Sequence, residues 1–166
     1  MASGDTLLTF HPYNNEPTAT VYATLDTRNQ HVVLDFDATT DESAVFSGVM
    51  PQHYAGTTGV TVYLHWSASS ATSGDTVWEA SFERVGIVLD VDADSFADVN
   101  FVADACDGTS GVLEVASIAF TDGADMDSVA VGEKFRLKIS RDANITNATD
   151  DMAGDAELHM VEIRET

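Results

Sequence analysis

Strict alternation of apolar and polar residues is the feature that most constrains the fold of this chain. In GVTVYLHWSA (59–68), apolar residues occupy every second position from Val60 to Trp66. Successive side chains of a β-strand point to opposite faces, so a period of two indicates a strand with one buried face. A helix would instead need apolar residues three and four positions apart. This segment is therefore predicted to be a half-buried strand.

A second segment, TVWEASFER (76–84), repeats the alternation with Trp78, Ala80 and Phe82 on the inward face. The connection between the two segments, SATSGD (70–75), consists of small and polar residues of the kind that form turns. We therefore expect the two strands to pair as one long antiparallel hairpin.

Further candidate strands are rich in Val, Thr, Phe and Tyr and are separated by Gly, Asp, Asn and Ser. They cover residues 5–10, 20–26, 31–37, 43–50, 86–91, 111–120, 134–140 and 155–164. Helical signal is confined to residues 121–130, where we expect one short turn with Asp122 or Asp125 as its N-cap.

The spacing of these segments predicts the fold class. About eight or nine strands, roughly ten residues apart and without βαβ alternation, indicate an all-β fold, an antiparallel β-sandwich of the jelly-roll type with little helix. The length of 166 residues suits a single β-sandwich domain spanning 1–166. The predicted core contains the inward residues of the strongest strands: Val62, Leu64, Trp66, Trp78, Phe82, Phe135, Leu137 and Leu158.

The charge balance argues against two classes of partner. The chain carries 28 acidic and only seven basic residues, which give a formal net charge of −21 and a pI of about 4.1. Nucleic acids and anionic membranes both require clustered Lys and Arg, so we expect neither as a partner. The opening MASGDTLLTF has no basic segment and no long apolar one, so we expect synthesis in a cytoplasm without a signal peptide.

Much of the positive charge is concentrated in one short segment, GEKFRLKISRDA (132–143). It contains Lys134, Arg136, Lys138 and Arg141, four of the seven basic residues. Apolar residues at 135, 137 and 139 alternate with them, which predicts a strand with a core face and a basic outer face.

Two explanations of this basic face remain open. In the first, the acidic residues Glu157 and Glu162 of the next strand lie opposite it in the same sheet, and each opposite-charge pair contributes roughly 0.2–1 kcal/mol. In the second, Lys134, Arg136, Lys138 and Arg141 lie at a subunit interface, because copies of an acidic chain must meet through a less acidic face.

No catalytic, cofactor or metal motif stands out. Asp90, Asp92 and Asp94 have the spacing of the first three EF-hand ligands, but the glycine and glutamate that should follow are absent. The histidines at 11, 31, 53, 65 and 159 are too far apart in the sequence for a metal motif. Acidic neighbours are expected to raise the pKa of Cys106, which argues against a reactive thiol. The sequence therefore predicts no enzyme activity, no cofactor and no metal requirement.

Aromatic residues are a further candidate feature. Glycan-binding surfaces stack sugar rings on exposed aromatic side chains, and the available residues are Tyr13, Tyr22, Tyr54 and Tyr63. They are scattered along the chain and do not form a recognisable cluster in the sequence.

Four stretches carry a resemblance to a known group of proteins: VTVYLHWSASSATSGDTVWEASFER (60–84), GEKFRLKISRDA (132–143), DDMAGDAELHMVEIRET (150–166) and the opening residues 1–37. These stretches resemble small virion structural proteins of tailed bacteriophages. The resemblance implies a non-enzymatic β-sandwich on the capsid surface. Such a protein decorates or cements the shell, usually as a homotrimer bound to the major capsid protein of the same virion.

Two functions are therefore expected from the sequence. The first is a capsid decoration (cement) protein. The alternative, because similar closing segments occur in fibre domains, is the receptor- or glycan-binding tip domain of a phage tail or head fibre.

Overall fold

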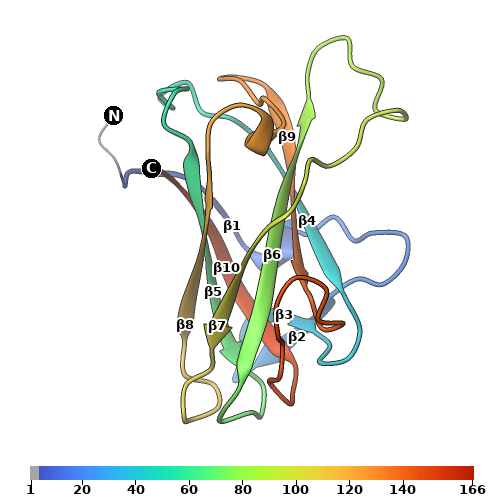
Figure 1. Ribbon diagram of the computed structural model, residues 1–166, viewed down its shortest axis with the longest axis vertical. Coiled ribbons are helices and arrows are strands. Elements are labelled where there is room, and N and C mark those ends of the chain that lie inside the picture. Colours follow the sequence, from blue (N-terminus) through green and yellow to red (C-terminus); the bar gives the residue numbers. More distant parts are fainter. Residues whose placement is uncertain (1–3) are drawn as a thin grey trace.

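The computed structural model describes residues 4–166, and its ten strands form two antiparallel sheets packed face to face (Figure 1). The strands and two single turns of 3-10 helix are β1 (Thr6–Phe10), η1 (Pro12–Asn14), β2 (Thr24–Arg28), β3 (His31–Phe36), β4 (Ser43–Val49), β5 (Val60–Ala68), β6 (Asp75–Val85), β7 (Asn100–Ala105), β8 (Glu114–Phe120), η2 (Ala124–Met126), β9 (Lys134–Arg141) and β10 (Ala156–Glu165). Within the described residues, neither helical turn is long and apolar enough to cross a membrane.

The strand order is that of a jelly roll. One sheet has the order β2-β3-β10-β5-β8, with β1 also paired to β10, and the other has the order β4-β9-β6-β7. The pairs β6–β7, β5–β8, β4–β9 and β3–β10 are nested, so the chain resembles one long hairpin folded over into two sheets. The predicted fold class is confirmed.

The predicted hairpin between residues 59–68 and 76–84 does not form. β5 pairs with β10 and β8 in the six-stranded sheet, whereas β6 pairs with β9 and β7 in the four-stranded sheet. The connection crosses from one sheet to the other, and the rings of Trp66 and Trp78 meet edge to face, 5.9 Å apart, across the core. Alternation identifies the buried face of a strand but not the strand that lies beside it.

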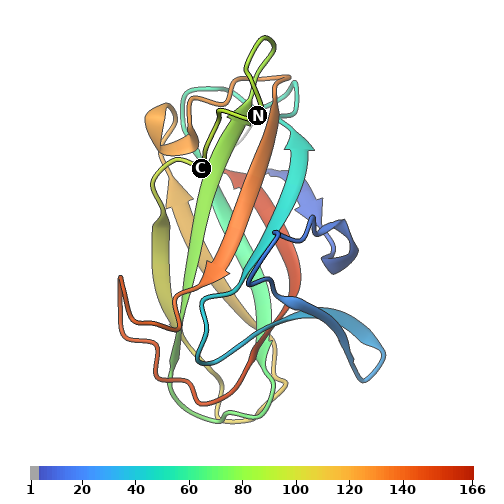
Figure 2. The same ribbon diagram turned by 90° about the vertical axis from the view of Figure 1, so that its right-hand side faces the viewer.

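Three of the predicted strands differ in the structure, including 111–120, since β8 begins only at Glu114. Residues 86–91 belong to the loop between β6 and β7, which rises beyond the ends of both sheets (Figures 1 and 2). Residues 100–105, which were not predicted as a strand, form β7. Residues 20–26 only partly match β2, which begins at Thr24. Apolar content alone therefore overestimated strand formation at 86–91.

The short helical turn expected within 121–130 is present as η2, but its cap differs. The N-cap is Gly123, which makes no side-chain capping bond. The carboxylate of Asp125 instead accepts a hydrogen bond from the backbone N–H of Thr121 at 2.6 Å. The other turn, η1, was not predicted and is capped by the side chain of His11.

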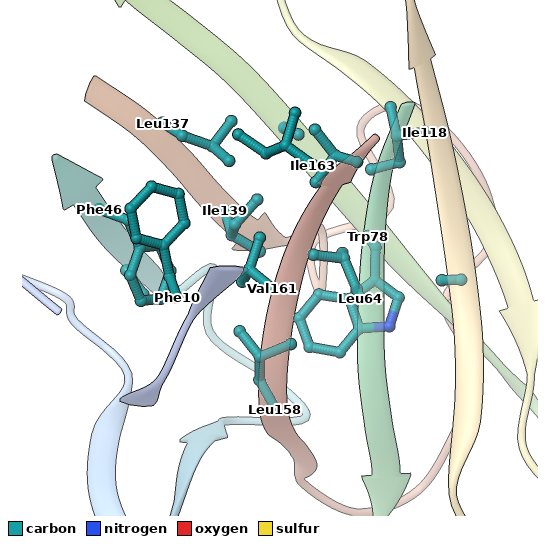
Figure 3. Close-up of a cluster of buried hydrophobic side chains, with 14 of the residues drawn as sticks. Phe10, Phe46, Leu64, Trp78, Ile118, Leu137, Ile139, Leu158, Val161 and Ile163 are labelled. Carbon is teal, nitrogen blue, oxygen red and sulfur yellow. The ribbon is translucent and has the colours of Figure 1, made fainter. Parts of the chain in front are cut away.

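The core lies between the two sheets, where side chains of both interdigitate (Figure 3). The predicted core residues are all fully buried, each exposing 1% of its surface or less: Val62, Leu64, Trp66, Trp78, Phe82, Phe135, Leu137 and Leu158. The core prediction is confirmed because each of these residues lies on the face that its strand's alternation assigned.

Candidate functional site

The four basic residues predicted to form one surface lie on two different faces of β9. Lys134, Arg136 and Lys138 are on the outer face, as expected. Arg141 lies on the same face as Ile139 and is completely buried. The prediction that Arg141 contributes to a subunit interface is therefore wrong. The alternation in this strand assigns its odd-numbered positions to the core, so the sequence itself indicated that Arg141 points inward.

Arg141 is held by hydrogen bonds on all of its N–H groups. Its Nε and Nη2 atoms donate to the two oxygens of Asp150 at 2.9 and 2.7 Å. Its remaining protons reach the backbone carbonyls of Phe36, Gly154 and Met152 at 3.3, 2.7 and 2.9 Å. A buried charge is tolerated when it is paired and its donors are satisfied. Arg141 thus ties β9 to the end of β3 and to the loop before β10.

On the outer face, Arg136 is neutralised from within its own sheet. Glu83 of β6 lies directly opposite it, and the Arg136 Nη1 atom donates to Glu83 at 2.8 Å. The acids expected in this role, Glu157 and Glu162, belong to β10 in the other sheet. Cross-strand neutralisation therefore occurs, but with a different strand, because β10 follows β9 in the chain without pairing to it.

The loop between β6 and β7 folds back over this basic face. The Phe96 ring lies under the guanidinium of Arg136 and the ammonium of Lys138, at 5.2 and 5.0 Å from its centre. The backbone N–H of Ala97 donates to the carbonyl of Phe82 at 2.8 Å and so anchors the loop to β6. The basic face is consequently covered in part by the chain itself.

The tip of the same loop exposes apolar side chains. Ile87 and Val88 are 90% and 99% exposed, and Val91 is 67% exposed. Val88 also has a φ of 71°, a left-handed conformation that β-branched residues rarely adopt. We call residues 87–91 the apolar tip.

A pocket of about 700 Å³ opens on the outer face of the six-stranded sheet, where β10 changes neighbours. One edge of β10 pairs with β3 over residues 156–158 and with β1 over residues 161–164. Between these two pairings β10 has an irregularity at 158–160. The pocket lies at this change of partner, between the end of β1 and the start of β3.

This pocket gathers four of the five histidines, and we call it the histidine pocket. They are His31 of β3, His65 of β5, His159 of β10 and His11, which directly follows β1. Their distances in the sequence gave no sign of this convergence, which depends on the strand order. Among residues 4–166, no group of three or more His, Cys, Asp or Glu side chains has the geometry of a metal site.

Arg28 forms one wall of the histidine pocket. Its Nη1 atom donates to Glu157 at 2.8 Å and to the carbonyls of Ala68 and Ser69 at 3.3 and 2.9 Å. Gly111 has a φ of +80°, and a Cβ there would come within 2.5 Å of the Arg28 guanidinium. Glycine suits this position because the backbone is left-handed, and a Cβ there would also force the guanidinium to move.

The hydrogen bonds around His159 define its tautomer. The Ser67 hydroxyl donates its single proton to Glu157 at 2.9 Å. The His159 Nε2 atom lies 2.9 Å from the Ser67 oxygen and must therefore be the donor of that bond. Burial is the main cause that lowers the pKa of His159 below its usual value. A neutral imidazole with its proton on Nε2 follows near neutral pH.

Two further carboxyl groups near the pocket differ sharply. A hydrogen bond from Arg164 is the main cause that lowers the pKa of Glu162 to about 2, and His65 lies 3.5 Å away from that carboxylate. Burial, followed by the charge of Glu157, raises the pKa of Asp35 to about 7. Asp35 therefore takes up a proton near neutral pH, whereas Glu162 stays ionised.

The four tyrosines considered for glycan stacking lie in different surroundings. Tyr13 and Tyr22 are 67% and 47% exposed and line the same small pocket of about 210 Å³. Tyr54 is buried and donates to Asp122 at 2.9 Å. The guanidinium of Arg164 lies over the ring of Tyr63, 4.2 Å from its centre, and covers that face.

The lone cysteine behaves as expected. Burial is the main cause that raises the pKa of the Cys106 thiol, and the negative charges of Asp107, Asp75 and Glu114 add to it. The direction agrees with the prediction, although burial contributes more than the acidic neighbours.

No family model and no curated protein matches the chain. Among solved structures, an isomalto-dextranase of Arthrobacter globiformis T6 complexed with panose aligns with a TM-score of 0.48 and 17% identity, over 80% of this chain and 18% of that one. The CBM22-1 xylan-binding domain of Paenibacillus barcinonensis Xyn10C aligns with a TM-score of 0.47 and 15% identity, over 99% and 97%. The Gx strain of infectious bursal disease virus aligns with a TM-score of 0.34 and 13% identity, over 99% and 33%. Similarity at this level does not identify what the chain binds.

Proposed function

We propose that the chain is a non-enzymatic structural protein of a bacteriophage virion. It acts as a decoration (cement) protein that binds the major capsid protein on the outer capsid surface, as a homotrimer, and stabilises the shell. The resemblance of residues 60–84, 132–143 and 150–166 to virion structural proteins supports this role. Its acidity suits a surface exposed to salt, where repulsion between copies is screened beyond roughly 8 Å.

The observation that carries the proposal is the apolar tip. Ile87 and Val88 are almost completely exposed on a chain with a net charge of −21. Removal of apolar surface from water gains roughly 25 cal/mol per Å², so burying this tip against a partner would stabilise the complex. The tip protrudes beyond the ends of both sheets, where a shell can reach it (Figure 1).

Co-sedimentation with capsids tests this attachment. Purified chain is mixed with capsids of the phage that encodes it, and the bound copies are counted by mass spectrometry. Ile87→Asp with Val88→Asp should abolish binding, whereas Leu25→Asp, at an exposed apolar position on β2, should leave it unchanged. Binding of the tip variant at the wild-type level would contradict the proposal.

The trimer has its own test. A trimer of chains that each carry a formal charge of −21 has a total charge of −63. The surface through which the subunits meet must therefore be less acidic than the rest. Lys134, Arg136 and Lys138 are the clustered basic residues of the outer face, and we place them at or near the subunit contact. Sedimentation should show a trimer for the wild type and a weaker one for Arg136→Glu with Lys138→Glu. A monomeric wild type at both low and high salt would contradict the trimer.

One observation favours the alternative, a receptor- or glycan-binding tip domain of a phage fibre. Tyr13 and Tyr22 lie together at one small pocket, as stacking residues do. A glycan array with the wild type and Tyr13→Ala separates the two functions. Glycan binding that is lost in the variant, with no binding to capsids, would favour the fibre role.

A further inference from the structure

We propose that the histidine pocket binds an acidic saccharide, a sugar ring that carries a carboxylate or a sulfate, and that protonation of its imidazoles controls this binding. The site is separate from the proposed capsid contact. The apolar tip belongs to the loop after β6 of the four-stranded sheet, whereas the pocket lies on the outer face of the six-stranded sheet.

The permanent charges that face the pocket largely cancel. Its two neighbouring glutamates are each paired with an arginine: Glu157 with Arg28, and Glu162 with Arg164, at 2.8 and 2.7 Å. β5 contributes His65 and Tyr63, and Val115 of β8 lies opposite His65. These two ion pairs cancel, so the remaining negative charge of this face comes from acids outside them.

Protonation then makes the pocket positive. Each of the four imidazoles that line the pocket can bind a proton and so add one positive charge. Burial lowers the pKa of His159, so this imidazole binds its proton at a lower pH than an ordinary histidine does. Asp26 and Asp35, on β2 and β3, are further acids of this face, and Asp155 lies near Asp35. Asp35 loses its charge as the pH falls, because its pKa is about 7. Protonation of the histidines and of Asp35 makes the pocket more positive, and both changes therefore favour the binding of an anion.

Arg28 provides a donor for the anion at any pH. All of its hydrogen bonds with residues 4–166 leave from Nη1, so its Nε and Nη2 protons are not used within the described chain. An arginine held in place with free donors suits a carboxylate or a sulfate. Gly111 supports this arrangement, because a Cβ there would displace the guanidinium.

The rest of the pocket suits the ring of a sugar. Val32, Leu113 and Met160 line it with aliphatic surface, on which the C–H face of a pyranose can pack. Small-molecule sites combine such apolar walls with a few polar groups and occupy about 300–1,000 Å³, a range that includes this pocket. A metal ion is not the expected ligand, because no group of described side chains has metal-site geometry.

Isothermal titration with three probes tests the inference. The probes are a galacturonic acid disaccharide, a sulfated galactose disaccharide and the neutral galactose disaccharide, each at about pH 5.5 and about pH 7.5. At least one acidic probe should bind at the lower pH and weaken about tenfold or more at the higher pH, as expected when one or more imidazoles lose their protons. The acidic probe that binds identifies the anionic group.

Matched variants locate the site. His31→Gln with His65→Gln should remove most of the pH dependence, and Arg28→Gln should weaken binding at both pH values. His53→Gln is the control, because His53 is exposed and lies outside the pocket. The double variant keeps the test valid if Arg28→Gln does not fold. Equal binding of the neutral probe, no binding of either acidic probe, or an equal effect of His53→Gln would overturn the proposal.

Discussion

Arg141 and Arg136 leave the same strand on opposite faces, and their surroundings differ accordingly. Arg141 is completely buried, and its N–H groups donate hydrogen bonds to Asp150 and to three backbone carbonyls. Arg136 is about one-third exposed and pairs with Glu83, with Glu16 at a longer distance. The comparison shows that a basic residue in a strand is assigned its role by the face it occupies. Clustering of charge in the sequence does not separate a structural arginine from a surface one.

The largest expected effect comes from breaking the buried pair. Arg141→Ala leaves Asp150 charged and buried without its partner, which should lower the free energy of unfolding by about 3–5 kcal/mol. Guanidinium unfolding followed by tryptophan fluorescence measures the loss. Arg141→Lys should recover only part of it, because a lysine cannot pair in a bidentate manner. A loss below about 1 kcal/mol would show that the pair is not needed.

A smaller effect is expected on the outer face. Arg136→Ala removes the hydrogen bond to the buried carboxylate of Glu83 and should cost about 1–2 kcal/mol. Because the arginine is partly exposed, high salt should reduce this cost, whereas the cost of Arg141→Ala should change little. The measurement is unfolding at low and high salt for both variants. Equal salt sensitivity would remove the proposed difference between the two faces.

Asp35 is a partly buried acid without an arginine partner, and we expect its removal to stabilise the fold rather than to destabilise it. The pKa of Asp35 rises from 3.8 to about 7 on folding, so the folded protein binds this proton more tightly than the unfolded chain does. The resulting destabilisation is greatest above pH 7 and shrinks as the pH falls. Asp35→Asn should therefore raise the melting temperature by a few degrees at about pH 8 and by less at about pH 5. An equal rise at both pH values would contradict the cause.

The smallest expected effect is that of metal removal. Asp94 lines a small pocket together with Lys134 and Arg136, so the chain itself supplies cations beside this acidic loop. EDTA should change the melting temperature by less than about 2 °C, which corresponds to under about 1 kcal/mol for a chain of this size. A larger drop would mean that the loop at 90–98 holds calcium.

Several features of the fold could be predicted from the sequence because they depend on local periodicity. Trp66, Trp78 and Leu137 are buried where alternation placed them. The all-β class also follows, since nearly every segment had a period of two. Even the burial of Arg141 agrees with the parity of its strand, although its charge suggested a surface position.

Which strands lie side by side could not be predicted, because pairing depends on contacts between residues far apart in the chain. Tertiary structure placed β5 and β6 in different sheets, paired Arg136 with Glu83, and gathered His11, His31, His65 and His159 at one pocket. A strand's own residues specify its two faces, whereas its neighbours are selected by the packing of the whole sandwich. The sequence by itself therefore determined the buried face of the strongest strands, and only the tertiary structure decided which outward side chains meet.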